Sequence, residues 1–267
     1  MIDIHCHILP GLDDGAKSLN EAVEMARIAE AEGIEKIVAT PHLFRGNYEY
    51  EDLSIIEDKR KELNSVLEAN SIQVEILEGA EVHISHNLID EIRKNRSHLV
   101  LHKSSYMSVE FPANHVYSGI KELFFELMSE GITPIIAHPE RNSVFIRNPS
   151  LLYELIQMGG LAQANSYSFS GIYGRDIKET VFRLLELNLI HFVGSDGHNK
   201  RSLAPRLMEA VKSIERVGGK KMAKALVWDN PKAVIEDREI PFLPEPIRLE
   251  ERAKKFRLNL PFFKIKK

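Results

Sequence analysis

The chain has 267 residues, of which 43% are hydrophobic, and a formal net charge of -4 from 35 basic and 39 acidic residues. This length and apolar content predict a globular protein with one large or two small domains and exclude a disordered chain. The single cysteine excludes an internal disulfide framework, no apolar run is long enough to span a membrane, and the first residues do not resemble a signal peptide. We expect a cytoplasmic protein, and its slight acidity argues against nucleic acid as a partner.

Short apolar runs and amphipathic segments alternate along the chain in a regular order. Strands are expected over residues 2–4, 36–39, 73–77, 108–111, 135–137, 161–164 and 190–193. Helices are expected over about 18–33, 52–69, 116–131, 149–158 and 176–187. Strands that alternate with helices predict parallel pairing and right-handed crossovers. At this length the α/β pattern favours a closed or nearly closed barrel over an open doubly wound sheet.

The C-terminal region differs in composition from the rest of the chain. Prolines become frequent after Pro231, and we expect this stretch to be irregular. The predicted main domain therefore covers residues 1–235, and residues 236–267 form a Pro-rich and then basic tail. Within it, Arg252–Lys267 carries seven basic residues and no acidic ones. Such a segment is typical of a solvated tail, and the alternative is a docking segment for an acidic partner.

Histidines and carboxylates gather at the ends of the expected strands. His5 and His7 end the first strand, and His42 follows the second. Glu81, Glu110, His138, Asp196 and His198 lie at or just after later strands. The candidates are five imidazoles and four carboxylates: His5, His7, Asp14, His42, Glu81, Glu110, His138, Asp196 and His198. Because the carboxyl ends of parallel strands face one mouth of the fold, where active sites form, we expect these side chains to converge.

The donor types in this set predict a metal centre. Alternate residues of a strand point the same way, so the imidazoles of His5 and His7 face one side, and the intervening Cys6 faces the other as a buried small hydrophobe. One metal takes about four to six ligands, so nine candidates suggest two or three ions with a bridging carboxylate. Nitrogen and oxygen donors without a thiolate favour manganese, zinc or iron.

Three divalent ions and four carboxylates would leave the site with a charge of about +2, which attracts a phosphate dianion. Such a cluster lowers the pKa of a bound water toward about 7, so that a metal-bound hydroxide is available at neutral pH. Arg141, three residues after His138, is placed to clamp phosphate oxygens, and a surface ion pair is its alternative role.

Missing motifs argue against other chemistries. Leu12 stands six residues after Cys6, where the thiol route to phosphate-ester cleavage needs an arginine. The phosphate-binding loop of nucleotide hydrolases, the dinucleotide-binding glycine motif and the zinc-protease helix motif are also absent. The remaining histidines are expected to be structural or on the surface: His83, His86, His98, His102, His115 and His191.

A set of motifs, in order along the chain, carries a family resemblance. The motifs lie at residues 1–17, 39–42, 79–81, 109–112, 137–141 and 195–199. Together they resemble the PHP (polymerase and histidinol phosphatase) superfamily. Within it they are most similar to the CpsB/CapC-type bacterial protein-tyrosine phosphatases linked to capsule and exopolysaccharide synthesis. The resemblance implies a distorted seven-stranded (β/α) barrel, TIM-like, with three divalent metal ions, commonly manganese.

The resemblance also implies a distribution of ligands. His5, His7, Glu81 and Asp196 would hold one ion; Glu81, Glu110 and His138 a second; and Asp14, His42 and His198 a third. Arg141 is implied as the arginine that binds the substrate phosphate. We assign the catalytic roles to Arg141, Asp196 and His42.

The sequence departs from the family pattern at Leu203, where a second phosphate-binding arginine is implied. Arg201 and Arg206 are the candidates to replace it. Arg45 is a further candidate for substrate binding. Together with Phe44 and Tyr48 it follows His42 and is placed to line a phosphotyrosine pocket, although the two aromatic residues are equally suited to packing.

These features predict a metal-dependent protein-tyrosine phosphatase in which a metal-bound hydroxide attacks phosphorus. The implied partner is the phosphotyrosine tail of a bacterial tyrosine kinase that regulates capsule or exopolysaccharide synthesis. One alternative is a small-molecule phosphomonoesterase such as histidinol-phosphate phosphatase. The other is a catalytically weak module that binds a phosphotyrosine tail, which the departure at Leu203 motivates.

Overall fold

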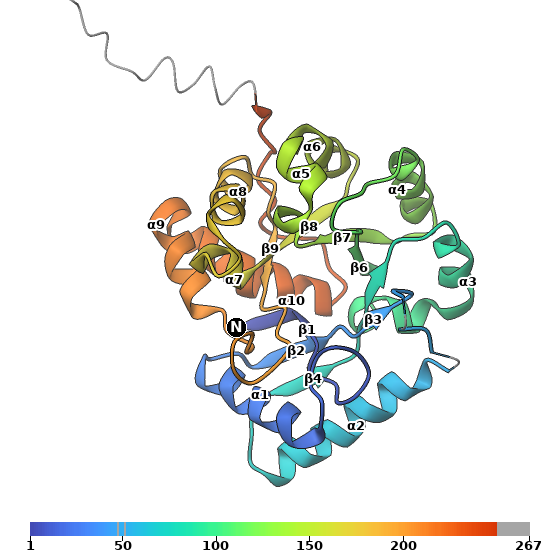
Figure 1. Cartoon of the computed structure of the whole chain (residues 1–267), viewed down its shortest axis with the longest axis vertical. Helices are drawn as coiled ribbons and strands as arrows, with labels where there is room; N and C mark the ends of the chain where they lie inside the picture. The colour runs from blue at the N-terminus through green and yellow to red at the C-terminus, as the bar shows by residue number, and fades with distance from the viewer. Residues whose placement is uncertain (47, 51, 250–267) are drawn as a thin grey trace, which may run out of the picture.

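A computed structural model describes residues 1–46, 48–50 and 52–249 of the chain (Figure 1). Two parallel sheets form its centre. One has the order β1 (Ile2–Cys6), β2 (Lys36–Ala39), β4 (Glu75–Leu77). The other has the order β3 (His42–Leu43), β5 (Glu81–His83), β6 (Tyr106–Glu110), β7 (Thr133–Ala137), β8 (Leu161–Asn165), β9 (Phe192–Gly194). All seven predicted strands are present, and β3 and β5 are additional.

The predicted single seven-stranded barrel is not confirmed, because the strands divide between two sheets. The chain breaks after β2 at Pro41, which has no backbone N–H for a ladder, and after β4 at Gly79. A Cβ atom at Gly79 would lie 2.6 Å from Val38 Cγ1, so this close approach requires glycine. Before the breaks, β2 pairs with β1 and β4 pairs with β2. After them, β3 pairs with β5, and β5 pairs with β6.

The two sheets meet where β1 and β9 end. Only an isolated bridge joins Cys6 to Gly197 there, with a hydrogen bond of 2.8 Å from His7 N to Gly197 O. A second hydrogen bond of 2.8 Å runs from Asp196 N to His5 O. The ends of the first and last strands are therefore adjacent without a regular ladder, and the segment after β9 lies against the segment after β1.

Helices surround the strands (Figure 1). The predicted ones are α1 (Leu19–Ala31), α2 (Ser54–Ala69), α4 (Ile120–Ser129), α6 (Pro149–Gln157) and α8 (Arg175–Glu186). The Ser18 hydroxyl accepts a hydrogen bond of 3.2 Å from Glu21 N and caps α1, whose buried face includes Ala22 and Ala26. This face covers the core and leaves the polar side to solvent.

Several helical segments were not predicted. They are α3 (Leu88–Leu99), η1 (Leu101–Lys103), η2 (Pro139–Arg141), α5 (Ser143–Arg147), α7 (Ser166–Ser170), α9 (Met208–Lys224), η3 (Ala225–Asp229) and α10 (Asn230–Ile235). Helix α3 buries only Leu88, Ile92 and Leu99, and the backbone of α9 is interrupted at Gly219, whose φ is +80°. The expectation of irregular chain after Pro231 is wrong as far as Ile235. Pro231 follows the π-helical segment η3, and the backbone at Asp229 and Asn230 is already in the right-handed helical region, so the chain continues from η3 into α10 without a break.

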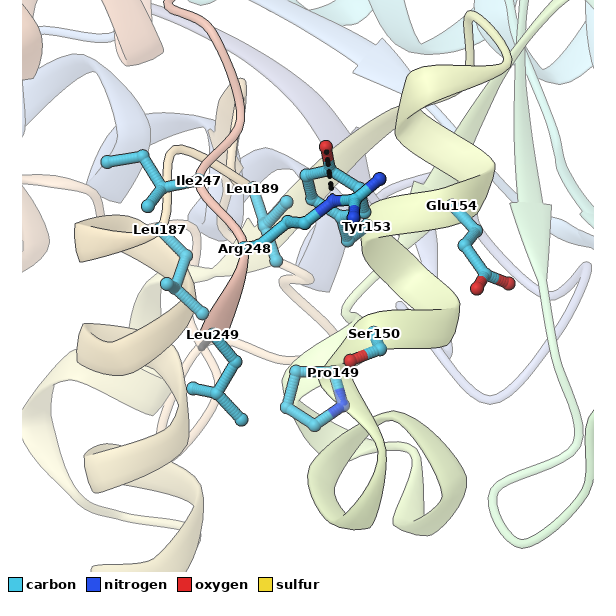
Figure 2. Close-up of a pocket in the computed structure, with 9 residues that line it drawn as sticks. All are labelled: Pro149, Ser150, Tyr153, Glu154, Leu187, Leu189, Ile247, Arg248 and Leu249. Carbon is cyan, nitrogen blue, oxygen red and sulfur yellow. Dashed lines mark hydrogen bonds between the residues drawn. The ribbon is translucent and has the colours of Figure 1, made fainter. Parts of the chain in front are cut away.

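The described chain after α10 lies along the body of the protein. The buried Asn230 side chain donates hydrogen bonds of 2.8 Å to His191 O and 2.9 Å to Phe242 O. Further on, Ile247 and Arg248 line a cavity of about 190 Å³ beside α6, where Arg248 Nε donates to the Tyr153 hydroxyl at 3.3 Å (Figure 2). The predicted basic segment Arg252–Lys267 lies outside the described residues. None of the helices in the described ranges is long and apolar enough to cross a membrane.

Candidate metal centre

The structure brings all nine candidate ligands into one cluster. Within it, four groups have donor atoms within 4.8 Å of one another: His7, Asp14, His42 and His198; His5, His7 and Glu81; His5, His138 and Asp196; His42, Glu81 and Glu110. His5, His7, His42 and Glu81 each belong to two of these groups, so the four groups are connected into one cluster. The side chains come from the carboxyl ends of β1, β6, β7 and β9, and from β3 and β5, which the breaks at Pro41 and Gly79 bring into the second sheet.

Glu81 lies at the centre of the cluster and is fully buried. Its Oε1 atom lies 3.0 Å from His138 Nε2 and 3.4 Å from His5 Nε2. Its Oε2 atom lies 2.9 Å from His42 Nδ1 and 3.4 Å from His7 Nε2, yet it makes no hydrogen bond. A buried carboxylate oxygen without a hydrogen bond, among imidazole nitrogens, is the environment that a bridging metal ligand needs.

The charge around Glu81 agrees with this interpretation. Burial by itself would raise the pKa of the Glu81 carboxyl, but the neighbouring imidazoles, His5 first, hold that pKa well below its usual range. Burial likewise opposes the charged form of His7. Asp13, Asp196 and Glu81 nevertheless raise the pKa of His7 well above its ordinary value. The site therefore concentrates anionic oxygens that favour cations, and these residues fit divalent metal ions.

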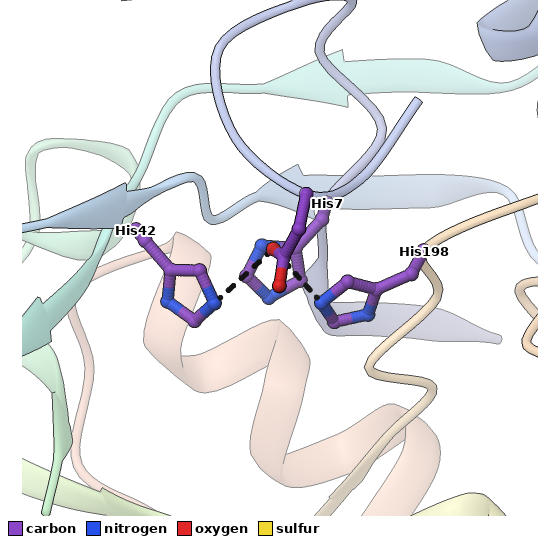
Figure 3. Close-up of side chains that lie close together, drawn as sticks. His7, His42 and His198 are labelled. Carbon is purple, nitrogen blue, oxygen red and sulfur yellow. Dashed lines mark ion pairs between the residues drawn. The ribbon is translucent and has the colours of Figure 1, made fainter. Parts of the chain in front are cut away.

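Asp14 joins two histidines from distant parts of the chain. Its Oδ1 atom lies 3.4 Å from His42 Nε2 and 3.4 Å from His198 Nε2. Figure 3 shows the His7, His42 and His198 side chains gathered at this place. The rings of His7 and His198 stack with centroids 4.0 Å apart. Unlike Glu81, the Asp14 side chain is 47% exposed, so this part of the cluster is open to solvent.

Asp196 and His138 have strained backbones. Their φ angles are +50° and +33°, in the left-handed region that non-glycine residues rarely adopt. Such strain is found at functional sites, where the surrounding structure maintains it. At Asp196 it places Oδ1 3.4 Å from His7 Nε2 and 3.5 Å from His5 Nε2. Its Oδ2 atom accepts hydrogen bonds of 2.5 Å from Arg141 Nη1 and 2.7 Å from Asn165 Nδ2.

Two residues that contact the candidate metal ligands, Asp13 and Gln163, were not identified from the sequence. The Asp13 side chain is 1% exposed, and its Oδ2 lies 2.7 Å from His7 Nδ1 and accepts from His42 N at 3.0 Å. Gln163 Oε1 lies 2.7 Å from His5 Nδ1. Partners of this kind fix the orientation and tautomer of metal-binding imidazoles. The Asp13-Asp14 pair was a visible signal for Asp13, whereas nothing in the sequence around Gln163 indicated its contact.

The four arginines assigned to substrate binding have different surroundings. Arg141 contacts Asp196, and Arg45 Nη1 lies 3.2 Å from Glu110 Oε1 and 2.5 Å from His42 Nε2. Arg206 instead pairs with Glu32 at 3.2 Å, and Arg201 is exposed. Within the described residues, neither of these two forms an ion pair with a candidate ligand. Leu203 O accepts a backbone hydrogen bond of 2.8 Å from His198 N.

Two further side chains bear on the chemistry. Cys6 is fully buried with its Sγ 3.5 Å from Gly197 O, and burial raises the pKa of its thiol well above the ordinary value. A buried neutral thiol is a poor nucleophile, which agrees with the predicted absence of cysteine chemistry. His83, expected to be structural or exposed, lies with its Nδ1 3.3 Å from Glu110 Oε2 at the edge of the cluster.

The chain is similar to known proteins over most of its length. The sequence model of the family "Capsular polysaccharide synthesis, CpsB/CapC" matches residues 1–236. Tyrosine-protein phosphatase YwqE of Bacillus subtilis is 40% identical over 240 residues, which cover 90% of this chain and 93% of that protein. Tyrosine-protein phosphatase CpsB of Streptococcus pneumoniae is 33% identical over 245 residues, 90% of this chain and 100% of that protein.

A similar solved structure is described as "Crystal structures of YwqE from Bacillus subtilis and CpsB from Streptococcus pneumoniae, unique metal-dependent tyrosine phosphatases". It has a TM-score of 0.89 and 37% sequence identity, and the match covers 93% of this chain and 99% of that chain. The match of the family model to most of the chain, with relatives above 30% identity, shows that this chain belongs to the CpsB/CapC family of capsular polysaccharide synthesis.

Proposed function

We propose that this chain is a metal-dependent protein-tyrosine phosphatase that hydrolyses phosphotyrosine, with its activity in residues 1–235. The observation that carries the proposal is the buried Glu81 carboxylate, which four imidazoles surround and whose Oε2 atom makes no hydrogen bond. Two relatives above 30% identity are named tyrosine-protein phosphatases, and a similar structure is described as metal-dependent.

Three divalent ions are proposed, with manganese expected first and iron or zinc as alternatives. In the distribution that the family resemblance implies, Glu81 would help to hold two of the ions, one together with His5, His7 and Asp196 and the other together with Glu110 and His138. Asp14, His42 and His198 would hold the third. When bound, ions of this kind supply positive charge to the phosphate and lower the pKa of water, the nucleophile of the hydrolysis.

The protein's own residues bind and orient the substrate in this proposal. The Arg141 guanidinium and the Arg45 guanidinium both line the cavity that also contains Glu110 and His138. Guanidinium groups bind phosphate oxygens through paired N–H donors, so these two arginines would hold the phosphate from the protein side. Asp196 and His42 act at the same place, since each contacts one of the two arginines and belongs to the ligand cluster.

The proposed substrate is the phosphotyrosine tail of a bacterial tyrosine kinase that regulates capsule or exopolysaccharide synthesis, and the proposed compartment is the cytoplasm. The family description supports the link to capsular polysaccharide. The names of the relatives support the phosphotyrosine chemistry.

The test is phosphate release from a phosphotyrosine peptide, with and without manganese, for the wild type and for His138→Ala. We expect turnover that depends on manganese and that the substitution abolishes, because His138 Nε2 contacts the central Glu81. His115→Ala is the matched control, since this exposed histidine lies outside the ligand cluster. No phosphate release from a protein shown to hold its metals would refute the proposal, and faster turnover of histidinol phosphate would favour the small-molecule alternative.

A further inference from the structure

Glu140 is a carboxylic acid that lies completely inside the protein, close to the proposed metal centre. It belongs to η2, two residues after His138 and directly before Arg141, and it is 0% exposed. Burial of a carboxylate is costly unless hydrogen bonds replace the lost water. Glu140 is neither a candidate metal ligand nor a phosphate-binding residue, so its burial needs another explanation.

One oxygen of the Glu140 carboxyl group contacts the segment at the end of β8. Glu140 Oε1 accepts hydrogen bonds of 2.8 Å from Asn165 N and 2.6 Å from Ser168 Oγ. Both of these residues are themselves fully buried. The other oxygen, Oε2, makes no hydrogen bond within the described residues. The carboxyl group therefore connects η2 to the start of α7.

Asn165 links this contact to the candidate ligand Asp196. Asn165 is the last residue of β8, and its Oδ1 atom accepts from Tyr167 N at 2.9 Å and caps α7. Its Nδ2 atom donates to Asp196 Oδ2 at 2.7 Å. Because Glu140 fixes the backbone of Asn165, it also fixes the donor that orients the Asp196 carboxylate.

The turn that contains Glu140 has a strained backbone. His138 at its start has a φ of +33°, and Arg141 N donates to His138 O at 2.9 Å and closes the turn. A residue in an unfavoured backbone conformation persists only where its surroundings hold it there. The hydrogen bond from Asn165 N to Glu140 holds this turn against the end of β8. The same turn carries a candidate metal ligand at its start and the proposed phosphate-binding arginine at its end.

We propose that Glu140 is a positioning residue that fixes the metal ligands and the phosphate-binding arginine relative to each other. The length of its side chain matters more than its charge, because a single acceptor atom joins η2 to Asn165. The proposal rests on the proposed phosphatase function and adds to it the means by which metal and phosphate are held together. Residues that support metal ligands contribute about tenfold to a hundredfold to metal affinity, and a misplacement of about 1 Å can cost a hundredfold in rate.

Two variants separate the length of the side chain from its charge. Glu140→Asp keeps the carboxylate but withdraws the acceptor from Asn165 N by about 1.5 Å, the length of one C–C bond. Glu140→Gln keeps the length and the acceptor oxygen but removes the charge. Isothermal titration calorimetry would measure the affinity of the metal-free protein for manganese and of the manganese-loaded protein for inorganic phosphate. We expect both affinities to fall about tenfold in Glu140→Asp and to stay within about threefold of the wild type in Glu140→Gln.

Ser168→Ala is the matched control. It removes the second partner of Glu140 Oε1 and leaves the hydrogen bond from Asn165 N in place. Loss of a buried hydrogen bond should lower the melting temperature of this variant. Its affinities for manganese and phosphate should nevertheless stay within about twofold of the wild type, because the Asn165 contact is the one that leads to Asp196. A purely structural role of Glu140 would lower the melting temperature of Glu140→Asp in the same way and leave both affinities unchanged.

Three results would overturn the proposal. The first is a folded Glu140→Asp protein whose two affinities equal those of the wild type. The second is an equal loss of affinity in Glu140→Gln and Glu140→Asp, which would assign the effect to charge. The third is an equal loss in Ser168→Ala, which would assign it to the packing of α7. If Glu140→Asp does not fold, wild-type affinities in Glu140→Gln support the proposal and reduced affinities overturn it.

These titrations do not depend on turnover. Failure to release phosphate from phosphotyrosine peptides would overturn the proposed function, whereas the affinities for manganese and inorganic phosphate would still decide the role of Glu140.

Discussion

Arg141 Nη1 lies 2.5 Å from Asp196 Oδ2, and the Tyr173 ring lies 4.6 Å from the centre of the guanidinium. Asn165 Nδ2 donates to the same Asp196 oxygen at 2.7 Å and to the Tyr173 hydroxyl at 3.2 Å. One network therefore fixes both a proposed metal ligand and the proposed phosphate-binding arginine. Binding of metal and binding of phosphate are expected to depend on each other through Asp196.

Replacing Arg141 by lysine should lower kcat/KM for a phosphotyrosine peptide about tenfold to a hundredfold. Lysine keeps the positive charge but loses the planar pair of donors and the stacking on Tyr173, and hydrogen bonds to charged groups contribute about 1.5–3 kcal/mol. Steady-state kinetics with metal content measured in parallel would check this. If Arg141→Lys holds its metals and has a kcat/KM within twofold of the wild type, Arg141 does not bind the substrate phosphate.

Replacing Asp13 by asparagine should weaken manganese binding about tenfold to a hundredfold, because the carboxylate behind His7 would lose its charge. Isothermal titration calorimetry, in which manganese is added to the metal-free protein, would measure the manganese affinity of both proteins. Asp90→Asn is the control, since that side chain is 69% exposed on α3. Unchanged manganese affinity in Asp13→Asn would mean that this contact does not support the metal site.

The contrast between Asp14 and Asp13 shows what the sequence reveals. Residue types that bind metals, placed at expected strand ends, indicated eight of the nine candidate ligands. Asp14 lies in the segment after the first strand and was named for its residue type and for the family resemblance. Asp13 contacts His7 Nδ1, and Gln163 contacts His5 Nδ1, through packing between distant segments that no local pattern encodes. The seven main strands were predictable from their apolar runs. Their division into two sheets depends on the breaks at Pro41 and Gly79. The local sequence does not show which strands pair on either side of these breaks, so the division could not be predicted.

Removal of metal should lower the melting temperature, because the cluster gathers four carboxylates whose charge the ions would offset. A ligand present at a hundred times its Kd stabilises the folded state by about 2.7 kcal/mol, which for a chain of this size corresponds to roughly 5–10 °C. Calorimetric scans in EDTA and after addition of manganese would measure the shift. His138→Ala should show a smaller shift than the wild type, and an identical shift in both would place the stabilising ion elsewhere.

His191 predicts an acid sensitivity that is independent of the metal cluster. Burial lowers the pKa of His191 from its ordinary 6.5 to about 4, and its ring accepts a hydrogen bond of 3.0 Å from Ala162 N at Nδ1. Between these two pH values the unfolded chain binds a proton that the folded chain does not. The free energy of unfolding therefore falls as the pH drops from 6.5 to about 4, and this residue has no effect above pH 6.5.

His191→Asn should remove most of this dependence, because the asparagine Oδ1 can accept the same hydrogen bond but does not titrate. Each pKa unit corresponds to about 1.4 kcal/mol, so the stability that the wild type loses between pH 7 and pH 4.5 should exceed the loss in the variant by roughly 2–3 kcal/mol. Urea unfolding of both proteins in EDTA at the two pH values would measure the difference and cancel the contribution of the cluster. His115→Asn, at an exposed position, should follow the wild type. Parallel losses in the wild type and His191→Asn would show that His191 is not the group that limits stability in acid.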